Sequence, residues 1–261
     1  MSLTGAVKGL RLQEDDFMIV MSIAGVDPSA GAGVFADLKT FQAVGVYGTG
    51  IVTALTAQNP YKFFSTLPVS EDYISEQIDS VMDAYEVEYI KTGMLYSPEI
   101  IKLVSEKITE YNLKAVVDPV MVATSGGDLT REDIAKAFNK YLLPKSILTT
   151  PNISEAEKLT GLKISTKDDA IRATEKIKCD SLITGGHLDG INTINIDGET
   201  SIVKQELIET DNLHGTGCNL SAAITAYLAK GNDLHTSILN ALDYVYDGIE
   251  NGDHGTLIAK L

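Results

Sequence analysis

The sequence lacks tryptophan, has only two cysteines and contains far fewer basic than acidic residues, and these shortages narrow the possible classes of protein. Cys179 and Cys218 are too few for a disulfide framework or a cysteine-rich zinc site. With 21 Lys and Arg against 36 Asp and Glu, the net charge is −15, which argues against nucleic acid or an anionic membrane as a partner. A nucleotide, if one binds, must then be held by backbone amides and a divalent cation.

Long apolar runs are also missing. No stretch approaches the roughly 20 apolar residues that a membrane-spanning helix needs, and residues 1–16 lack the apolar centre of a secretory signal. We therefore expect a cytoplasmic protein in which residues 1–16 form a flexible lead-in and residues 17–261 form one domain. A length of 261 residues with 44% hydrophobic side chains is suited to one large core.

Short β-branched runs alternate with amphipathic stretches along the chain. Buried strands are predicted at residues 18–24, 51–55, 89–93, 115–118, 147–150 and 181–184. Helices are predicted near residues 33–43, 71–84, 97–111, 130–141, 153–160 and 166–178. Regular alternation of this kind predicts an α/β fold with a doubly wound, mostly parallel central sheet flanked by helices. Residues 190–210, centred on Asp197-Gly198, predict a small hairpin that adds antiparallel strands.

The turn His214-Gly215-Thr216-Gly217-Cys218 leads into a helix that runs to Gly231. Apolar residues at helical spacing predict one buried face, and Thr216 is the expected N-cap. The free N–H groups and the positive end of the helix dipole make this turn an anion site, most obviously for phosphate. Cys218 lies in that field beside His214, so we expect a lowered thiol pKa and a thiolate or general base. The alternative is a tight connection with a small buried cysteine.

The first strand is followed by a Gly-rich loop from Gly25 to Gly33. It is not a P-loop, because no Gly-Lys-Ser/Thr follows, and it lacks the acidic residue of a dinucleotide fingerprint between Leu38 and Ser70. The loop is either a plain strand-to-helix turn or a place where a small ligand approaches the backbone.

Acidic and amide side chains follow the fourth and fifth predicted strands. Asp118 ends one strand, and Asn152 and Glu155 follow the next. Ligands of such sheets bind beyond the carboxyl ends of the strands, where these oxygens can hold a hydrated Mg²⁺. Taken singly, Glu155 is equally a first-turn acid that stabilises its helix and Asp118 a cap or turn residue. Together with the anion site, the set indicates phosphoryl transfer.

Seven segments, in order between about Met18 and Gly231, resemble the hydroxymethylpyrimidine/phosphomethylpyrimidine kinases of thiamine biosynthesis, members of the ribokinase-like superfamily. The segments are Ser22-Ile23-Ala24-Gly25, Ala36-Asp37-Leu38-Lys39-Thr40-Phe41, Thr53-Ala54-Leu55-Thr56-Ala57-Gln58-Asn59, Lys91-Thr92-Gly93-Met94-Leu95, Val117-Asp118-Pro119-Val120-Met121-Val122-Ala123, Thr150-Pro151-Asn152-Ile153-Ser154-Glu155-Ala156 and His214-Gly215-Thr216-Gly217-Cys218. The resemblance implies a ribokinase-like fold and a homodimer. It also implies ATP-dependent phosphorylation of the hydroxymethyl group of 4-amino-5-hydroxymethyl-2-methylpyrimidine, and of the monophosphate afterwards.

The resemblance also assigns residues. The pyrimidine pocket corresponds to Gly25, Asp37, Gln58, Met94 and Val120, where Asp37 would accept a hydrogen bond from the exocyclic amine and Gln58 would meet the ring nitrogens.

The phosphoryl and nucleotide sides follow in the same way. Gly215, Thr216 and Gly217 correspond to the anion hole, and Cys218 to the acceptor of the hydroxymethyl proton. The Mg²⁺ ligands correspond to Asp118 and Glu155, and the ATP-binding residues to Asn152, Glu155, Thr184 and Gly186.

Two departures concern the nucleotide. Family members carry Lys at the position of Thr184, and Thr184 has no charge to offer the ATP phosphates; the family's C-terminal tail is also longer. Two other interpretations therefore stay open: a pyridoxal or pyridoxine kinase, and a catalytically impaired pyrimidine-binding regulator.

Overall fold

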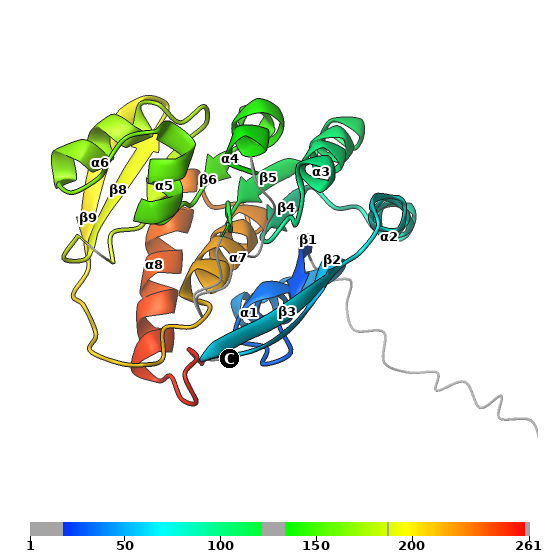
Figure 1. Ribbon diagram of the computed structural model, residues 1–261, viewed down its shortest axis with the longest axis horizontal. Coiled ribbons are helices and arrows are strands. Elements are labelled where there is room, and N and C mark those ends of the chain that lie inside the picture. The colour runs from blue at the N-terminus through cyan, green and yellow to red at the C-terminus, as the bar shows by residue number, and fades with distance from the viewer. Residues whose placement is uncertain (1–17, 122–133, 187, 259–261) are drawn as a thin grey trace, which may run out of the picture.

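A nine-stranded sheet runs through the protein in the computed structural model, which describes residues 18–121, 134–186 and 188–258. The strands lie in the order β3-β2-β1-β4-β5-β6-β7-β8-β9 (Figure 1). Their bounds are β1 Ile19–Val26, β2 Tyr47–Asn59, β3 Lys62–Pro68, β4 Tyr89–Thr92, β5 Lys114–Val117, β6 Leu148–Thr149, β7 Ser181–Ile183, β8 Ile191–Ile196 and β9 Glu199–Lys204. The strands from β2 to β7 in this order are parallel, whereas β3, β8 and β9 pair antiparallel with their neighbours.

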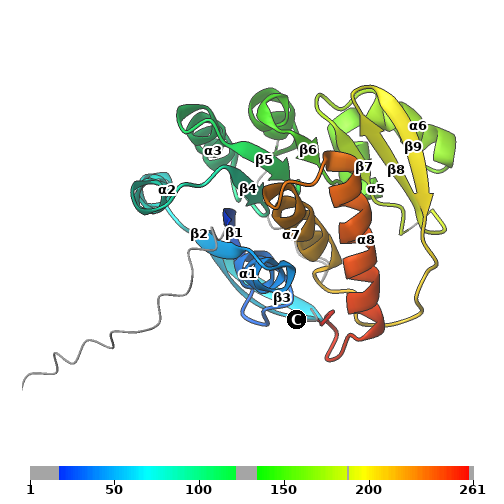
Figure 2. The same cartoon turned by 180° about the vertical axis from the view of Figure 1, so that it is seen from behind.

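Helices cover both faces of the sheet (Figures 1 and 2). Their bounds are α1 Gly33–Val44, α2 Glu71–Ala84, α3 Pro98–Glu110, α4 Ile134–Ala137, α5 Ile153–Thr160, α6 Lys167–Thr174, α7 Thr216–Ala229 and α8 Leu234–Glu250. After α4 the chain continues through a π-helical turn, Phe138–Leu142, and a 3₁₀ turn, Leu143–Lys145. Helices α2 to α6 pack on one face, and α1, α7 and α8 on the other, which confirms the predicted doubly wound architecture.

The central strands are buried on both faces because successive side chains point in opposite directions. In β5, Ala115 and Val117 join the hydrophobic cluster under α2 to α6, and Val116 joins the cluster under α1, α7 and α8. This is why the parallel strands are continuous apolar runs rather than alternating ones in the sequence.

The predicted hairpin is present as β8 and β9, joined through Asp197 and Gly198, which both have positive φ. Two elements were not predicted, β3 and α8, and β2 is longer than expected at its start. Gly48 and Gly50 obscured that start; a Cβ at Gly48 would lie 2.7 Å from the Phe41 ring, so glycine there lets α1 pack against the strand.

Helix α7 differs from its prediction in two ways. Its N-cap is Gly215, with φ of 84° and no side-chain cap, so the expected cap by Thr216 is wrong. It is also buried on nearly all sides rather than on one face, because it lies between the sheet, α1 and α8.

The lead-in predicted for residues 1–16, the first residues of the helix predicted at 130–141, and His187 lie outside the described residues. Within the described part, no helix is both long and apolar enough to cross a membrane.

Candidate active site

A cavity of about 740 Å³ opens beyond the carboxyl ends of the parallel strands. It is lined by the residues that follow β1, β4, β5, β6 and β7, by the starts of α5 and α7, and by one side of α8. The lining includes most of the residues singled out in the sequence: Gly25, Gln58, Met94, Asp118, Val120, Asn152, Glu155, Thr184, Gly186, Gly215, Thr216, Gly217 and Cys218. Segments that are far apart in the chain therefore meet in one hollow.

One end of the cavity is apolar. Met94 packs with Ala54, Phe63, Tyr96 and Val120, and a Cβ at Gly25 would lie 3.0 Å from the Met94 sulfur. Gln58 brings an amide to this end from β2. The pocket therefore offers apolar walls and one group that both donates and accepts hydrogen bonds.

Asp37 is paired with a buried lysine. Its side chain has no exposed surface, and its two oxygens lie 2.9 and 3.0 Å from the Lys91 ammonium. Ser22 donates a further hydrogen bond to the same carboxylate. Asp37 is therefore not part of the cavity lining in this structure, and its contact with the substrate amine stays a prediction. Asp37 instead neutralises a buried lysine beneath the site.

Lys91 was missed in the sequence. Burial alone would lower the pKa of Lys91, but the carboxylate of Asp37, with Cys218 and Asp118 nearby, raises it above its usual range. The ammonium is therefore a permanent positive charge below the strand ends, held by its partner from α1.

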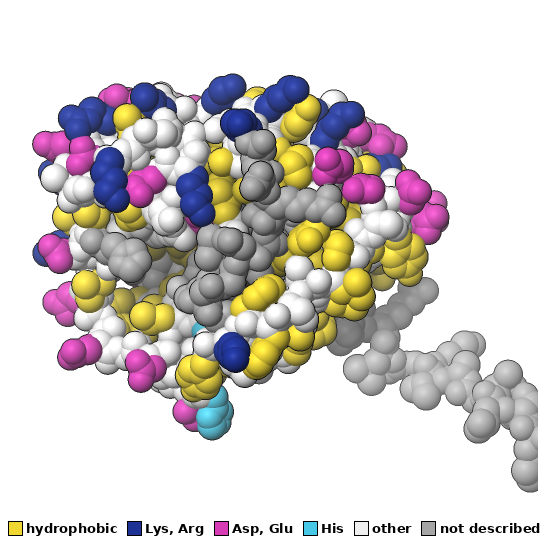
Figure 3. All heavy atoms as spheres, viewed as in Figure 1, with side chains coloured by type: hydrophobic (Ala, Val, Ile, Leu, Met, Phe, Trp, Pro, Cys, Tyr) yellow, Lys and Arg dark blue, Asp and Glu magenta, His cyan; other side chains and the backbone are white. Residues whose placement is uncertain are grey.

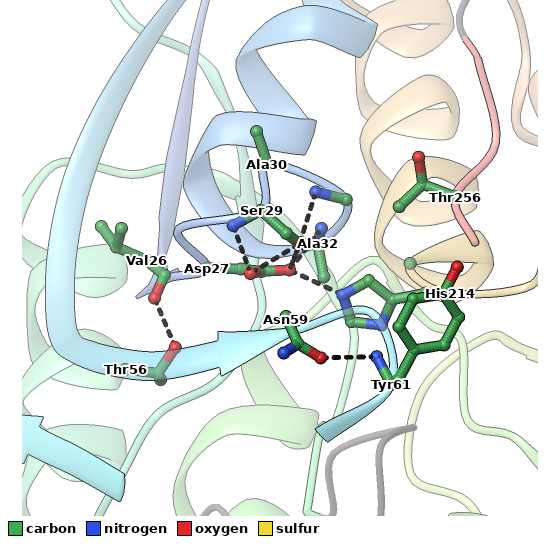
Figure 4. A network of polar contacts seen from close by, with 12 residues as sticks. Val26, Asp27, Ser29, Ala30, Ala32, Thr56, Asn59, Tyr61, His214 and Thr256 are labelled. Carbon is green, nitrogen blue, oxygen red and sulfur yellow. Dashed lines mark hydrogen bonds and ion pairs between the residues drawn. The ribbon is translucent and has the colours of Figure 1, made fainter. Parts of the chain in front are cut away.

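A second buried pair joins the Gly-rich loop to the anion turn (Figure 4). His214 Nε2 lies 2.6 Å from Asp27 Oδ2, and both side chains line the cavity. Asp27 also accepts hydrogen bonds from the Ser29 backbone and hydroxyl and from the Ala32 N–H, at 2.8 to 3.1 Å. Burial alone would raise the pKa of Asp27, but the hydrogen bonds from His214 and Ser29 outweigh it and hold the pKa below its usual value.

The two loops also touch through their backbones. A Cβ at Gly215 would lie 1.7 Å from the Gly31 carbonyl oxygen, and the φ of 84° at Gly215 is itself suited to glycine. The N–H groups of Gly217 and Cys218 are in the first turn of α7, where no intrahelical acceptor exists. Because Gly217 and Cys218 line the cavity, the turn presents free N–H donors beside it, as an anion site requires.

Cys218 lies in the first turn of α7, near the Gly-rich loop that follows β1 and near Asp118 after β5. The Gly33 N–H and the Asp118 carboxyl group lie close enough to its sulfur to act on its pKa. The expected lowering of its pKa is wrong: burial raises the pKa of Cys218 to about 12 against the opposing effect of Lys91, and the charges of Asp118 and Asp37 add to the rise. The thiol is therefore protonated at neutral pH.

Asp118 and Glu155 are two buried carboxyl groups whose pKa values are both raised. Burial raises the pKa of Asp118 to about 6 even though Lys91 acts against it, and burial together with the Asp118 charge raises the pKa of Glu155 to about 8. Two buried carboxyl groups that resist ionising together fit a divalent cation, which favours both charged forms. The described residues contain no group of three or more His, Cys, Asp or Glu that could hold a metal, so water and a ligand would have to complete the coordination.

Asn152 has a structural task as well. It caps α5: its Oδ1 accepts from the Glu155 N–H at 2.9 Å, and Glu155 Oε2 accepts from the Asn152 N–H at 3.0 Å. Thr184 lies next to it, because the Thr184 N–H donates to the Pro151 carbonyl at 3.0 Å. Lys158, one turn further along α5, also lines the cavity and was not noted in the sequence, although its spacing from Glu155 places both on one helix face.

Known proteins are similar to this chain in sequence and in fold. The phosphomethylpyrimidine kinase family model matches residues 27–257. A hydroxymethylpyrimidine/phosphomethylpyrimidine kinase of Rhizobium meliloti is 42% identical over 243 residues, which cover 90% of this chain and 91% of that protein.

Solved structures agree. A phosphomethylpyrimidine kinase of Clostridium difficile superposes with a TM-score of 0.79 at 37% identity, covering 88% of this chain and 99% of that one. An ADP complex of Bacillus subtilis pyridoxal kinase gives a TM-score of 0.82 at 36% identity, covering 90% and 92%. This agreement confirms the predicted resemblance and the ribokinase-like fold, and the chain belongs to the phosphomethylpyrimidine kinase family.

Proposed function

We propose that the protein uses ATP to phosphorylate the hydroxymethyl group of 4-amino-5-hydroxymethyl-2-methylpyrimidine, and then the monophosphate, with residues 17–261 acting as one kinase domain. One observation carries the proposal. The free N–H groups at Gly217 and Cys218 line the same cavity as the apolar Gln58–Met94 pocket and the Asp118–Glu155 pair. A phosphoryl acceptor, an anion hole and a cation site are thereby brought together.

The substrate ring fits the apolar end. Met94 and Val120 supply walls, and the Gln58 amide can donate to a ring nitrogen, which is an acceptor, and accept from the exocyclic amine, which is a donor. Cys218 borders the same cavity, so a ring held at this end can bring its hydroxymethyl group to the Cys218 sulfur.

The transfer depends more on position than on a strong base. Mg-ATP, when bound, supplies the transferred phosphoryl group and the cation that neutralises its charge. The N–H groups of Gly217 and Cys218 stabilise the negative charge of the phosphoryl oxygens, and Cys218 accepts the hydroxymethyl proton. Because the transition state is loose, the proton leaves late. The Cys218 thiol, whose resting pKa is about 12, takes up this proton at its sulfur as it passes its own proton to the neighbouring Asp118 carboxylate.

The residues for the nucleotide side follow from the same geometry. Asp118 and Glu155 would hold Mg²⁺, and the Asn152–Thr184 junction with Gly186 would face the phosphates. The apolar side of the cavity toward α8, lined by Val245, Tyr246 and Ile249, is suited to the adenine base.

A pyridoxal or pyridoxine substrate is the second candidate, because a pyridoxal kinase is among the close structural relatives. The two ring systems share the hydroxymethyl group to be phosphorylated, so the same anion turn serves either. An inactive regulator is not supported, since the chain belongs to a kinase family and the anion turn and acidic pair line one cavity.

We also propose a homodimer formed through the β2–β3 ribbon. Strand β3 is at the edge of the sheet, and Tyr61, Phe64 and Leu67 are 70%, 59% and 64% exposed. Figure 3 shows hydrophobic side chains gathered over this ribbon. An exposed apolar edge strand of this kind is suited to pairing with a second copy.

The proposed function is tested by ADP release from purified protein with Mg-ATP and each of four acceptors: hydroxymethylpyrimidine, its monophosphate, pyridoxal and pyridoxine. We expect the highest kcat/KM with the two pyrimidines. A higher kcat/KM with pyridoxal or pyridoxine would transfer the assignment to the second candidate, and no acceptor-dependent ADP release would refute both.

A further inference from the structure

The cavity lining is more acidic than basic among the described residues. It holds four carboxyl side chains, Asp27, Asp118, Glu155 and Glu206, and a single Lys or Arg, Lys158, within the described part of the chain. The whole chain, these residues included, has a net charge of −15. A polyphosphate entering this field needs local positive charge, since like charges a few ångströms apart repel strongly in a partly buried site.

Lys158 is placed where that charge is useful. Along α5, Asn152, Glu155 and Lys158 follow each other at intervals of three residues, and all three line the cavity. Thr184 joins this group through its bond to the Pro151 carbonyl. Glu155 and Lys158 are one turn apart on α5 and both line the cavity, so the Lys158 side chain extends from the same face of the helix as the acidic pair.

The Lys158 ammonium is also free to bind an anionic ligand. The side chain is exposed, and within the described residues it makes no hydrogen bond or ion pair. Lys163, which follows α5, is different: its ammonium is 3.2 Å from the Glu157 carboxylate, outside the cavity lining. A flexible lysine left without a partner at the edge of an acidic cavity can reach an anionic ligand through its four-carbon stem.

We infer that Lys158 is the cation that binds the polyphosphate of the nucleotide in this site, beside the neutral Thr184. The identity of the ligand as an adenine nucleotide rests on the proposed function; the role of Lys158 rests on the charge distribution of the cavity. The competing explanation is structural, because a lysine in the last turn of a helix stabilises the helix dipole.

The two explanations predict different effects of Lys158→Ala on ligands that carry different numbers of phosphate groups. Calorimetric titration, without any pyrimidine, would compare adenosine, AMP, ADP and a non-hydrolysable ATP analogue on the wild type, Lys158→Ala and the matched control Lys163→Ala. We expect Lys158→Ala to weaken ADP and the ATP analogue by about tenfold at low salt, as for the loss of one charge-assisted hydrogen bond, and to leave adenosine unchanged. The loss should shrink as salt is added, because salt screens the interaction.

The control should bind all four ligands as the wild type does. Equal weakening of adenosine and ADP in Lys158→Ala, or no weakening of either, would overturn the inference. The kinase assignment would stand in both cases, because acceptor-dependent ADP release tests it separately.

A second variant tests whether a positive charge placed at another position in the cavity can replace the Lys158 ammonium in ADP binding. Thr184→Lys, introduced into Lys158→Ala, places an ammonium on the other side of Asn152 and should restore most of the lost ADP affinity. Failure to restore it would show that charge at this end of the cavity is not what the nucleotide requires, and would also overturn the inference.

Discussion

Replacing Asp27 by asparagine removes one negative charge from the pair that holds the Gly-rich loop against the anion turn. The side chain is 1% exposed and accepts hydrogen bonds from His214, Ser29 and the Ala32 N–H. Asparagine keeps one acceptor oxygen and brings an NH₂ group to a place where only donors point. Loss of a buried, hydrogen-bonded charge in this setting should lower the free energy of unfolding by about 2 to 4 kcal/mol.

The destabilisation should depend on pH. Because the pKa of Asp27 is lowered in the folded protein, its carboxylate contributes stability above the unfolded pKa, near 3.8, and loses that contribution as pH falls through the folded value. Asparagine does not titrate. The difference in unfolding free energy between the wild type and Asp27→Asn should therefore be full near about pH 5 and shrink toward about pH 3, a window in which unfolded histidine stays protonated.

Urea unfolding at several pH values measures this difference directly. Asp79→Asn is the matched control, since Asp79 also pairs with a basic side chain, that of Lys107, but is itself 43% exposed; the substitution should cost less than about 1 kcal/mol. Equal destabilisation by the two variants would show that the buried Asp27–His214 pair is not special. A difference in unfolding free energy between the wild type and Asp27→Asn that stays constant from about pH 5 to about pH 3 would show that Asp27 does not titrate as expected.

Three further predictions follow from the site and the sheet edge. Cys218→Ala should lower kcat by about 10² to 10⁴ while pyrimidine binding, measured by titration, stays largely intact; near-normal turnover would remove Cys218 from the mechanism. Asp37→Asn should destabilise the fold by about 3 to 5 kcal/mol in urea unfolding because it leaves Lys91 buried without a charged partner, and an effect confined to pyrimidine KM would contradict this. Leu67→Lys should yield a monomer by light scattering where the wild type is a dimer, and an unchanged mass would place the interface elsewhere.

The central architecture could be predicted from the sequence because it depends on local pattern. Strands such as β1 and β5 are buried on both faces and therefore are apolar runs of limited length. Strand β3 lacks this signal, since it lies at the edge with both faces largely exposed. Helix α8 had a usable signal that was overlooked: Ile238, Ala241, Leu242 and Val245 repeat at helical spacing and are buried.

The site was predicted in part for the same reason. Residues that follow strands meet at one edge of a parallel sheet, so Asp118, Asn152 and Glu155 could be grouped without a structure. Gly25, Met94 and Thr184, by contrast, were assigned through the family resemblance. The electrostatics could not be predicted. The pairing of Asp37 with Lys91 joins residues 54 positions apart, and the raised pKa of Cys218 comes from burial that only the packed structure creates.

The mass of the product gives the most direct test of the proposed phosphoryl transfer. Wild-type protein incubated with Mg-ATP and hydroxymethylpyrimidine should convert the pyrimidine to a species heavier by one phosphoryl group, carried on the hydroxymethyl oxygen, with one ADP formed for each. Cys218→Ala under the same conditions should give little of it. Consumption of ATP at the same rate with and without pyrimidine, and no change in the mass of the pyrimidine, would contradict the account.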